Sequence, residues 1–92
     1  MARYLIEVPH SSEKVACARA IQYFLQTGSH FLANADWGCL DGEHKAWIVI
    51  EGDSKEEVLS VLPLDARAKA KVVRLARFTM SDVDDILTQH EQ

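Results

Sequence analysis

A thiol and an imidazole lie on either side of a short turn in this chain, Cys39 before Asp41-Gly42 and His44 after it. Asp-Gly between two runs of alternating residues is typical of a β-hairpin with a two-residue type I′ loop, because both central residues of that turn need a positive φ. In such a hairpin Cys39 pairs directly with His44, and paired residues share one face of the sheet with Cβ atoms about 5 Å apart. The sequence therefore predicts that this thiol and this imidazole are neighbours at one end of a sheet.

His10 is the third candidate ligand of this group. It follows the first predicted strand, and alternation places it on the same face as Cys39 and His44. Two imidazoles and a thiolate suit a divalent transition metal such as Zn, Ni or Cu, and they leave one coordination position for water. The alternative interpretation is that Cys39 is a small buried apolar residue and that both histidines are surface residues beside turns. The second cysteine, Cys17, is expected to be a buried structural residue of a helix.

Four strands and three helices are predicted around these residues. Runs of β-branched and aromatic residues indicate the strands, and serines that cap a helix N-terminus indicate where helices begin. In chain order, the elements are a strand over 3–8, a helix from Ser11 or Ser12 to about 27, strands over 30–39 and 43–51, a short helix from Ser54 that Pro63 ends, a strand over 70–78, and a last helix capped by Ser81.

This order of elements predicts an α+β fold of the ferredoxin-like type. Its β-α-β-β-α-β arrangement forms a four-stranded antiparallel sheet in the order 4-1-3-2, with the two main helices on one face. The 92 residues are expected to form a single domain, with a core over 1–79 and a C-terminal helix over 80–92. In this order the end of the first strand lies beside the hairpin that joins the second and third strands, so His10, Cys39 and His44 should converge.

A second group of polar residues is expected on the face of the sheet that the helices leave open. Glu7, Asp36, Trp47 and Arg74 alternate onto that face, whereas Val73 is expected to point into the core. Glu7 and Arg74 lie on adjacent predicted strands and are expected to pair. Carboxylates partly buried in a dimer cavity have raised pKa values and could move protons, so the group is a candidate ligand-binding site. The alternative is a polar dimer interface in which Trp47 is an anchor.

Composition and charge exclude several classes of protein. The hydrophobic fraction is 48%, the net charge is −4 and the isoelectric point is about 5.4, so nucleic acid is not an expected partner. No apolar run approaches the roughly 20 residues that span a membrane, and the N-terminus has no apolar segment typical of a signal peptide. Two cysteines do not make a disulfide framework, which favours a reducing, cytoplasmic setting.

Part of the chain resembles the dimeric α/β-barrel superfamily. The stretch Ala46-Trp47-Ile48-Val49-Ile50-Glu51-Gly52-Asp53-Ser54-Lys55-Glu56-Glu57-Val58 is similar to the third strand and second helix of the YCII-related and muconolactone-isomerase-like groups, and 68–75 is similar to their fourth strand. The resemblance implies a ferredoxin-like subunit and a homodimer, and it carries over no catalytic residue. An apolar open face, made of Leu5, Leu32, Trp47 and Val49, also favours a homodimer.

Three functions remain open at this point. The first is a homodimeric binding protein that holds a transition metal or a small ligand without turnover. The second is a cofactor-free isomerase or lyase that acts on a small hydrophobic acid or lactone through Glu7 or Asp36. The third is an accessory subunit of a larger assembly. The sequence has no nucleotide-binding loop, nucleophile elbow or HExxH pattern, which disfavours the common enzyme classes.

Overall fold

A four-stranded antiparallel sheet forms the centre of the molecule. The computed structural model describes residues 1–90. The strands are ordered β2-β3-β1-β4, which is the predicted order 4-1-3-2 read from the other edge. The elements are β1 (Ala2–Pro9), α1 (Lys14–Gln26), α2 (His30–Ala33), β2 (Asp36–Trp37), the 3-10 helix η1 (Cys39–Asp41), β3 (Lys45–Gly52), α3 (Lys55–Leu59), α4 (Leu64–Arg67), β4 (Lys71–Leu75) and α5 (Met80–His90).

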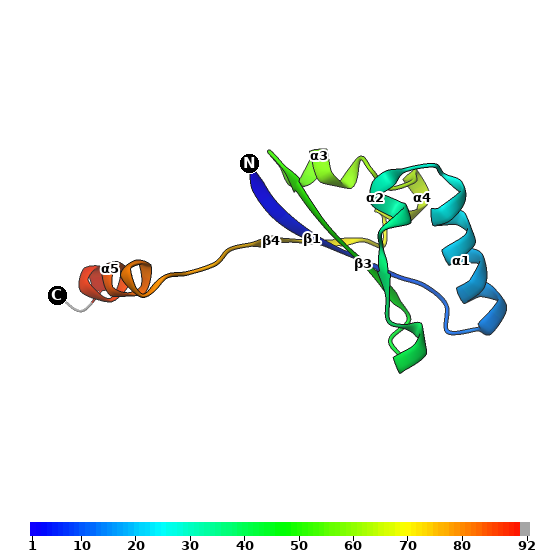
Figure 1. The fold of residues 1–92 in the computed structure, drawn as a ribbon, viewed down its shortest axis with the longest axis horizontal. Helices are drawn as coiled ribbons and strands as arrows, with labels where there is room; N and C mark the ends of the chain where they lie inside the picture. Colours follow the sequence, from blue (N-terminus) through cyan, green and yellow to red (C-terminus); the bar gives the residue numbers. More distant parts are fainter. Residues whose placement is uncertain (91–92) are drawn as a thin grey trace.

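The core lies between one face of the sheet and the helices α1 to α4 (Figure 1). In the two central strands every second residue is buried, as the alternation of apolar residues predicts. The core consists of Tyr4, Ile6, Val8, Ala46, Ile48 and Ile50 from the sheet, together with Phe24, Leu32, Val58 and Leu62 from the segments that cover it. The predicted α+β fold and the faces of β1 and β3 are therefore confirmed.

The segment before β2 is helical rather than extended. A strand was predicted over 30–39, but His30–Ala33 forms α2 and the strand is limited to Asp36–Trp37. The reason is local capping: the Leu32 amide donates to the Ser29 hydroxyl at 3.3 Å, and the Asn34 amide group donates to the His30 carbonyl at 2.7 Å. These bonds close a single helical turn, and Leu32 enters the core instead of the open face.

The edge strand β4 has the opposite orientation from the one predicted. Its register pairs Leu5 with Val73 and Tyr4 with Arg74, so Val73 lies on the open face and Arg74 on the face that carries the helices. The expected Glu7–Arg74 pair is therefore wrong. Val72 and Val73 are both apolar, so alternation alone does not decide which one points inward, and pairing with β1 makes that choice.

The chain leaves the body of the protein after β4. Residues 76–79 are extended, and α5 lies far from the sheet at the end of a molecule that measures 57 × 27 × 20 Å (Figure 1). Thr79, rather than Ser81, caps α5: its amide donates to the Asp82 carboxylate at 2.9 Å, and the Asp82 amide donates to its hydroxyl at 3.1 Å. The predicted C-terminal helix is thus present up to His90, and residues 91 and 92 lie outside the described part. No helix within residues 1–90 is long and apolar enough to cross a membrane.

Candidate metal centre

The turn between β2 and β3 is longer than the predicted two-residue loop. Gly38 donates to the Lys45 carbonyl at 3.1 Å and accepts from the Glu43 amide at 3.0 Å, so residues 39–44 lie beyond the ladder. A type I′ loop needs two positive φ angles, but in this hairpin only Gly42 has one, at 79°, where it ends η1. The predicted two-residue turn is therefore wrong, and Cys39 and His44 are not a ladder pair.

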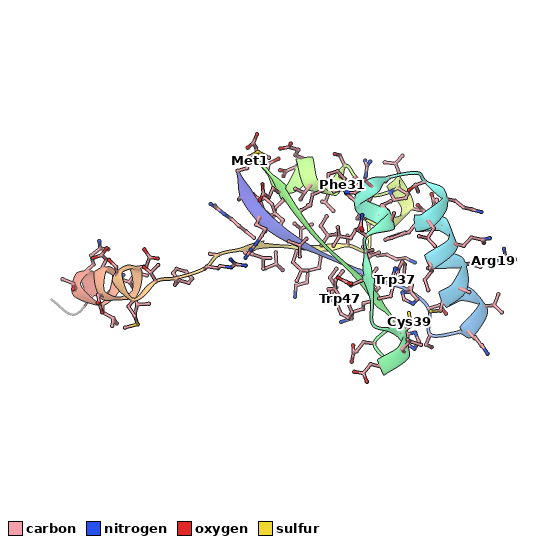
Figure 2. All side chains as sticks on the ribbon, in the orientation of Figure 1. Met1, Arg19, Phe31, Trp37, Cys39 and Trp47 are labelled. Carbon is pink, nitrogen blue, oxygen red and sulfur yellow. The ribbon has the colours of Figure 1, made fainter. Side chains whose placement is uncertain are left out.

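Cys39 and His44 nevertheless lie together with His10. The His10 amide donates to the His44 carbonyl at 3.0 Å, which joins the end of β1 to the end of the loop. His10 Nε2 lies 3.2 Å from Cys39 Sγ, and the two imidazole rings are 5.6 Å apart between centroids. Figure 2 shows Cys39 below Trp37 where the hairpin begins. The structure thus brings together all three residues of the predicted metal set.

Cys17 is a fourth member of this cluster. It lies in the first turn of α1, with its sulfur 3.3 Å from His10 Nε2 and 3.0 Å from Cys39 Sγ. One ligand atom from each of the four residues lies within 4.8 Å of the others. Cys17 is buried, as predicted, but its position beside His10 and Cys39 was not predicted. The available signal was its spacing from Phe24, which puts both side chains on the buried side of α1, close to the end of β1.

The four residues fit a tetrahedral metal ion. A zinc ion with bonds of about 2.3 Å to sulfur and about 2.0 Å to nitrogen holds its ligand atoms roughly 3.3–3.8 Å apart. His10 Nε2 lies 3.2 and 3.3 Å from the two sulfurs, all four ligand atoms lie within 4.8 Å of one another, and the two sulfurs, 3.0 Å apart, would have to separate by somewhat less than about 1 Å to hold the ion. Two thiolates and two imidazoles are also a common donor set for zinc. With Cys17 included, the protein can fill all four positions, so the open position expected from the three-residue set is not required.

The site contains nitrogen atoms that are buried without a partner. Among residues 1–90, Nδ1 of both His10 and His44 is buried and has no hydrogen-bond partner. A buried polar atom without a partner costs free energy, and a bound ion would satisfy one nitrogen of each ring that it contacts. The unpaired Nδ1 of His44 therefore fits a metal ligand, whereas in His10 the nitrogen beside the two sulfurs is Nε2, so an ion bound there would leave Nδ1 of His10 unpaired.

Burial and close packing set the protonation states of the cluster. Burial, and secondarily the nearby His44, lowers the pKa of His10 below its ordinary value of 6.5. The hydrogen bond that the protonated Cys39 thiol shares with Cys17, followed by burial, raises the pKa of the Cys39 thiol above its ordinary value of 9.0. At neutral pH His10 is therefore a neutral ligand, whereas Cys39 holds a proton that an arriving ion must displace.

Aromatic rings enclose the cluster on one side. Trp37 contacts His10 edge to face at a centroid distance of 5.4 Å and contacts Phe24 at 5.0 Å. A cavity of about 170 Å³ reaches His10 and Trp37, and Tyr23 and Lys69 also line it. The rings restrict the orientation of His10, which is the one member of the cluster that lines this cavity.

The predicted group on the open face is only partly assembled. Glu7 and Asp36 both pair with Trp47 across the sheet, but Arg74 lies on the other face. The Glu7 carboxylate accepts from the Trp47 indole at 3.2 Å and lies 3.7 Å from the Lys45 ammonium group. Glu7 is therefore already partnered, and a ligand-binding role for this group stays a prediction.

Comparisons with protein-family models, with curated proteins and with solved structures find no match to this chain. The dimeric α/β-barrel resemblance is thus supported by the fold class alone, and the functional argument depends on the site.

Proposed function

We propose that this protein binds one zinc-type ion through His10, Cys17, Cys39 and His44. The observation that carries the proposal is the convergence of four ligand atoms within 4.8 Å from three separate parts of the chain. A site closed by four protein ligands is typical of a structural ion rather than a catalytic one. The protein is therefore proposed to be a metal-binding module, and within residues 1–90 the isomerase or lyase alternative is supported only by the partly assembled group of Glu7, Asp36 and Trp47.

Zinc suits this donor set better than the other metals considered. Two thiolates favour soft or borderline ions, and a tetrahedral arrangement of two sulfur and two nitrogen atoms is typical of zinc. Nickel and divalent copper prefer tetragonal coordination. In the described residues, no carboxylate belongs to the cluster, which disfavours magnesium, calcium and manganese.

We also propose that the module acts as a homodimer related to the dimeric α/β-barrel proteins. The strand order and the exposed side chains of Val49 and Val73 on the open face support this part of the proposal.

The direct test is the metal content of protein that is purified without an affinity tag. Elemental analysis is expected to find about one zinc per chain, and Cys17→Ser and Cys39→Ser should each remove most of it. His30→Ala is the matched control, because His30 is an exposed histidine on α2, outside the cluster. Equal zinc content in the wild type and both cysteine variants would contradict the site.

Cobalt substitution reports on the ligands themselves. Cobalt-loaded protein should show thiolate-to-metal charge-transfer absorption, and the band should weaken in either single serine variant and disappear in the double variant. A spectrum without thiolate bands would exclude coordination by the two cysteines, whatever the zinc content.

A further inference from the structure

The C-terminal helix α5 presents an apolar stripe with nothing against it. Val83, Ile86 and Leu87 share one side of the helix and are 37%, 47% and 47% exposed, and α5 has no buried residue. It stands at the end of the extended segment 76–79, away from the body of the protein (Figure 1). An isolated helix of this length is marginal in water, because most helical stability comes from packing of the apolar side. We therefore expect the apolar side of α5 to pack against another surface.

The open face of the sheet is an equally unpartnered surface. The helices α1 to α4 pack on the other face, and Leu5, Val49 and Val73 lie side by side in the register of the three strands that present them. Val49 is 57% exposed and Val73 37% exposed. Trp47, two residues before Val49 on β3, lies beside this row on the same face.

Charge on the open face is mixed, and part of it is complementary to α5. Between Met80 and His90 the helix carries Asp82, Asp84 and Asp85 and no lysine or arginine. From Ala66 to Met80 the chain carries five basic residues and no acidic one. The five are Arg67, Lys69, Lys71, Arg74 and Arg77. Of these five, only Lys71, which shares its face with Val73, lies on the open face, and Arg3, which shares its face with Leu5, lies there too. Both can attract the acidic helix, and each lies opposite a glutamate, Glu7 or Glu51.

We propose that two copies of this chain exchange their C-terminal helices, so that α5 of each copy packs on the open sheet face of the other. The extended residues 76–79 continue in the direction of β4 and place α5 beyond the ends of the strands of its own sheet. A symmetric exchange covers both exposed surfaces of both copies, whereas a different partner protein on either surface would leave the other bare. This interface is independent of the metal centre and defines how the homodimer forms.

The test uses charge-introducing variants with matched controls, measured by light scattering on the full-length protein. Wild type should have twice the mass of one chain, and Ile86→Asp and Val49→Asp should each lose the dimer. Thr88→Asp, on the opposite side of α5, and Leu40→Asp, at the exposed hairpin loop, introduce the same charge and should leave the dimer intact. All four positions are exposed, and circular dichroism verifies that each variant is folded.

Mixing the two disrupted variants identifies the exchange. An Ile86→Asp chain keeps an intact sheet face and a Val49→Asp chain keeps an intact helix, so the mixture should regain part of the dimer through one undamaged contact. A monomeric wild type would overturn the proposal in favour of α5 folding back on its own chain. A dimeric Val49→Asp variant would overturn it in favour of contact between the two helices, and failure of the mixture to form dimers would also count against exchange.

Discussion

The two cysteine sulfurs decide the chemistry available at the scale of single residues. Cys17 Sγ and Cys39 Sγ are 3.0 Å apart, and both contact the same imidazole nitrogen of His10. Two thiols this close can bind one metal ion together or, when oxidised, form a disulfide. Each behaviour leads to a separate measurement.

Metal affinity should depend on pH in a direction set by the two shifted groups. Because the pKa of His10 lies below 6.5, this imidazole stays neutral at that pH, and protons compete for it only under more acidic conditions. Because the pKa of Cys39 lies above 9.0, zinc must displace its proton at neutral pH, so affinity should rise with pH through the neutral range.

Calorimetry in buffers of different ionisation enthalpy measures this proton release directly. We expect zinc uptake to release at least about one proton per ion near neutral pH, because the Cys39 thiol must lose its proton to bind. Dialysis at decreasing pH should show zinc loss beginning below about pH 6.5. Uptake without proton release would contradict the raised pKa of the Cys39 thiol.

Peroxide should convert the metal-free protein to an intrachain disulfide. One peroxide takes two electrons and two protons from the thiols of Cys17 and Cys39, and the products are one disulfide and two waters. Intact mass should fall by two hydrogens, and bound zinc should slow the reaction. In Cys17→Ser, the same treatment should give no intrachain bond; crosslinked chains in the wild type would indicate that the two sulfurs do not meet.

Alkylation should distinguish the same two thiols in native protein without metal. Cys39 is half-buried at the start of the hairpin loop, whereas Cys17 is buried on the side of α1 that faces the sheet. Cys39 is therefore expected to react first, which peptide mapping after brief alkylation would show. Faster modification of Cys17 would mean that α1 separates from the sheet in the metal-free protein.

At the scale of elements, the ion would attach α1 to the sheet. Of the residues of α1, only Cys17 and Phe24 are buried, so apolar packing holds this helix weakly. A metal bound by Cys17, His10 and the hairpin residues would connect the first turn of α1 to the ends of β1 and β3. Such a connection adds stability that the small core does not supply.

Removal of zinc should therefore loosen one element more than the rest. A chelator is expected to increase amide hydrogen exchange strongly in α1 and around Cys39, while the amides of β1 and β3 remain protected. Exchange measured by mass spectrometry with and without zinc tests this expectation. Uniform loss of protection would indicate that the whole fold depends on the ion.

Substitution of Gly38 measures how strongly zinc binding depends on the geometry of the hairpin. A Cβ at this position would lie 2.6 Å from the Glu43 carbonyl oxygen and 2.7 Å from Trp47 Cζ3, so Gly38→Ala must displace the hairpin. We expect a loss of about 1–3 kcal/mol in unfolding free energy together with weaker zinc binding. Gly28→Ala is the control: its Cβ meets nothing within 4 Å, so the substitution should cost only about 1–2 kcal/mol of backbone strain at φ 75° and leave zinc affinity unchanged.

At the scale of the whole molecule, the candidate metal centre and α5 lie at separate ends. The cluster is beside the hairpin, whereas α5 is beyond the opposite end of β4 (Figure 1). Ile86→Asp is therefore expected to abolish the dimer and keep the full zinc content, and Cys39→Ser should do the reverse. Loss of both properties in either variant, by light scattering and elemental analysis, would show that the two sites are coupled.

Sequence alone determined the strand order, the buried faces of β1 and β3 and three of the four clustered residues. These features follow from local rules, because alternation has a fixed period of two and the order of elements leaves few topologies for a sheet this small. His10, Cys39 and His44 meet as predicted even though the loop from Cys39 to His44 is not the predicted two-residue turn. The ends of this loop remain next to the ends of the strands, and His10 follows the neighbouring strand β1.

Only the tertiary structure decided the place of Cys17 in the cluster, the orientation of β4 and the exposure of α5. Whether a helix residue reaches a site depends on how the helix is rotated against the sheet, and periodicity within the helix does not set that rotation. Likewise, the side chain of Val73 or Arg74 points inward or outward according to its pairing with β1. Contacts between segments distant in the chain make these choices, so no local pattern of residues contains them.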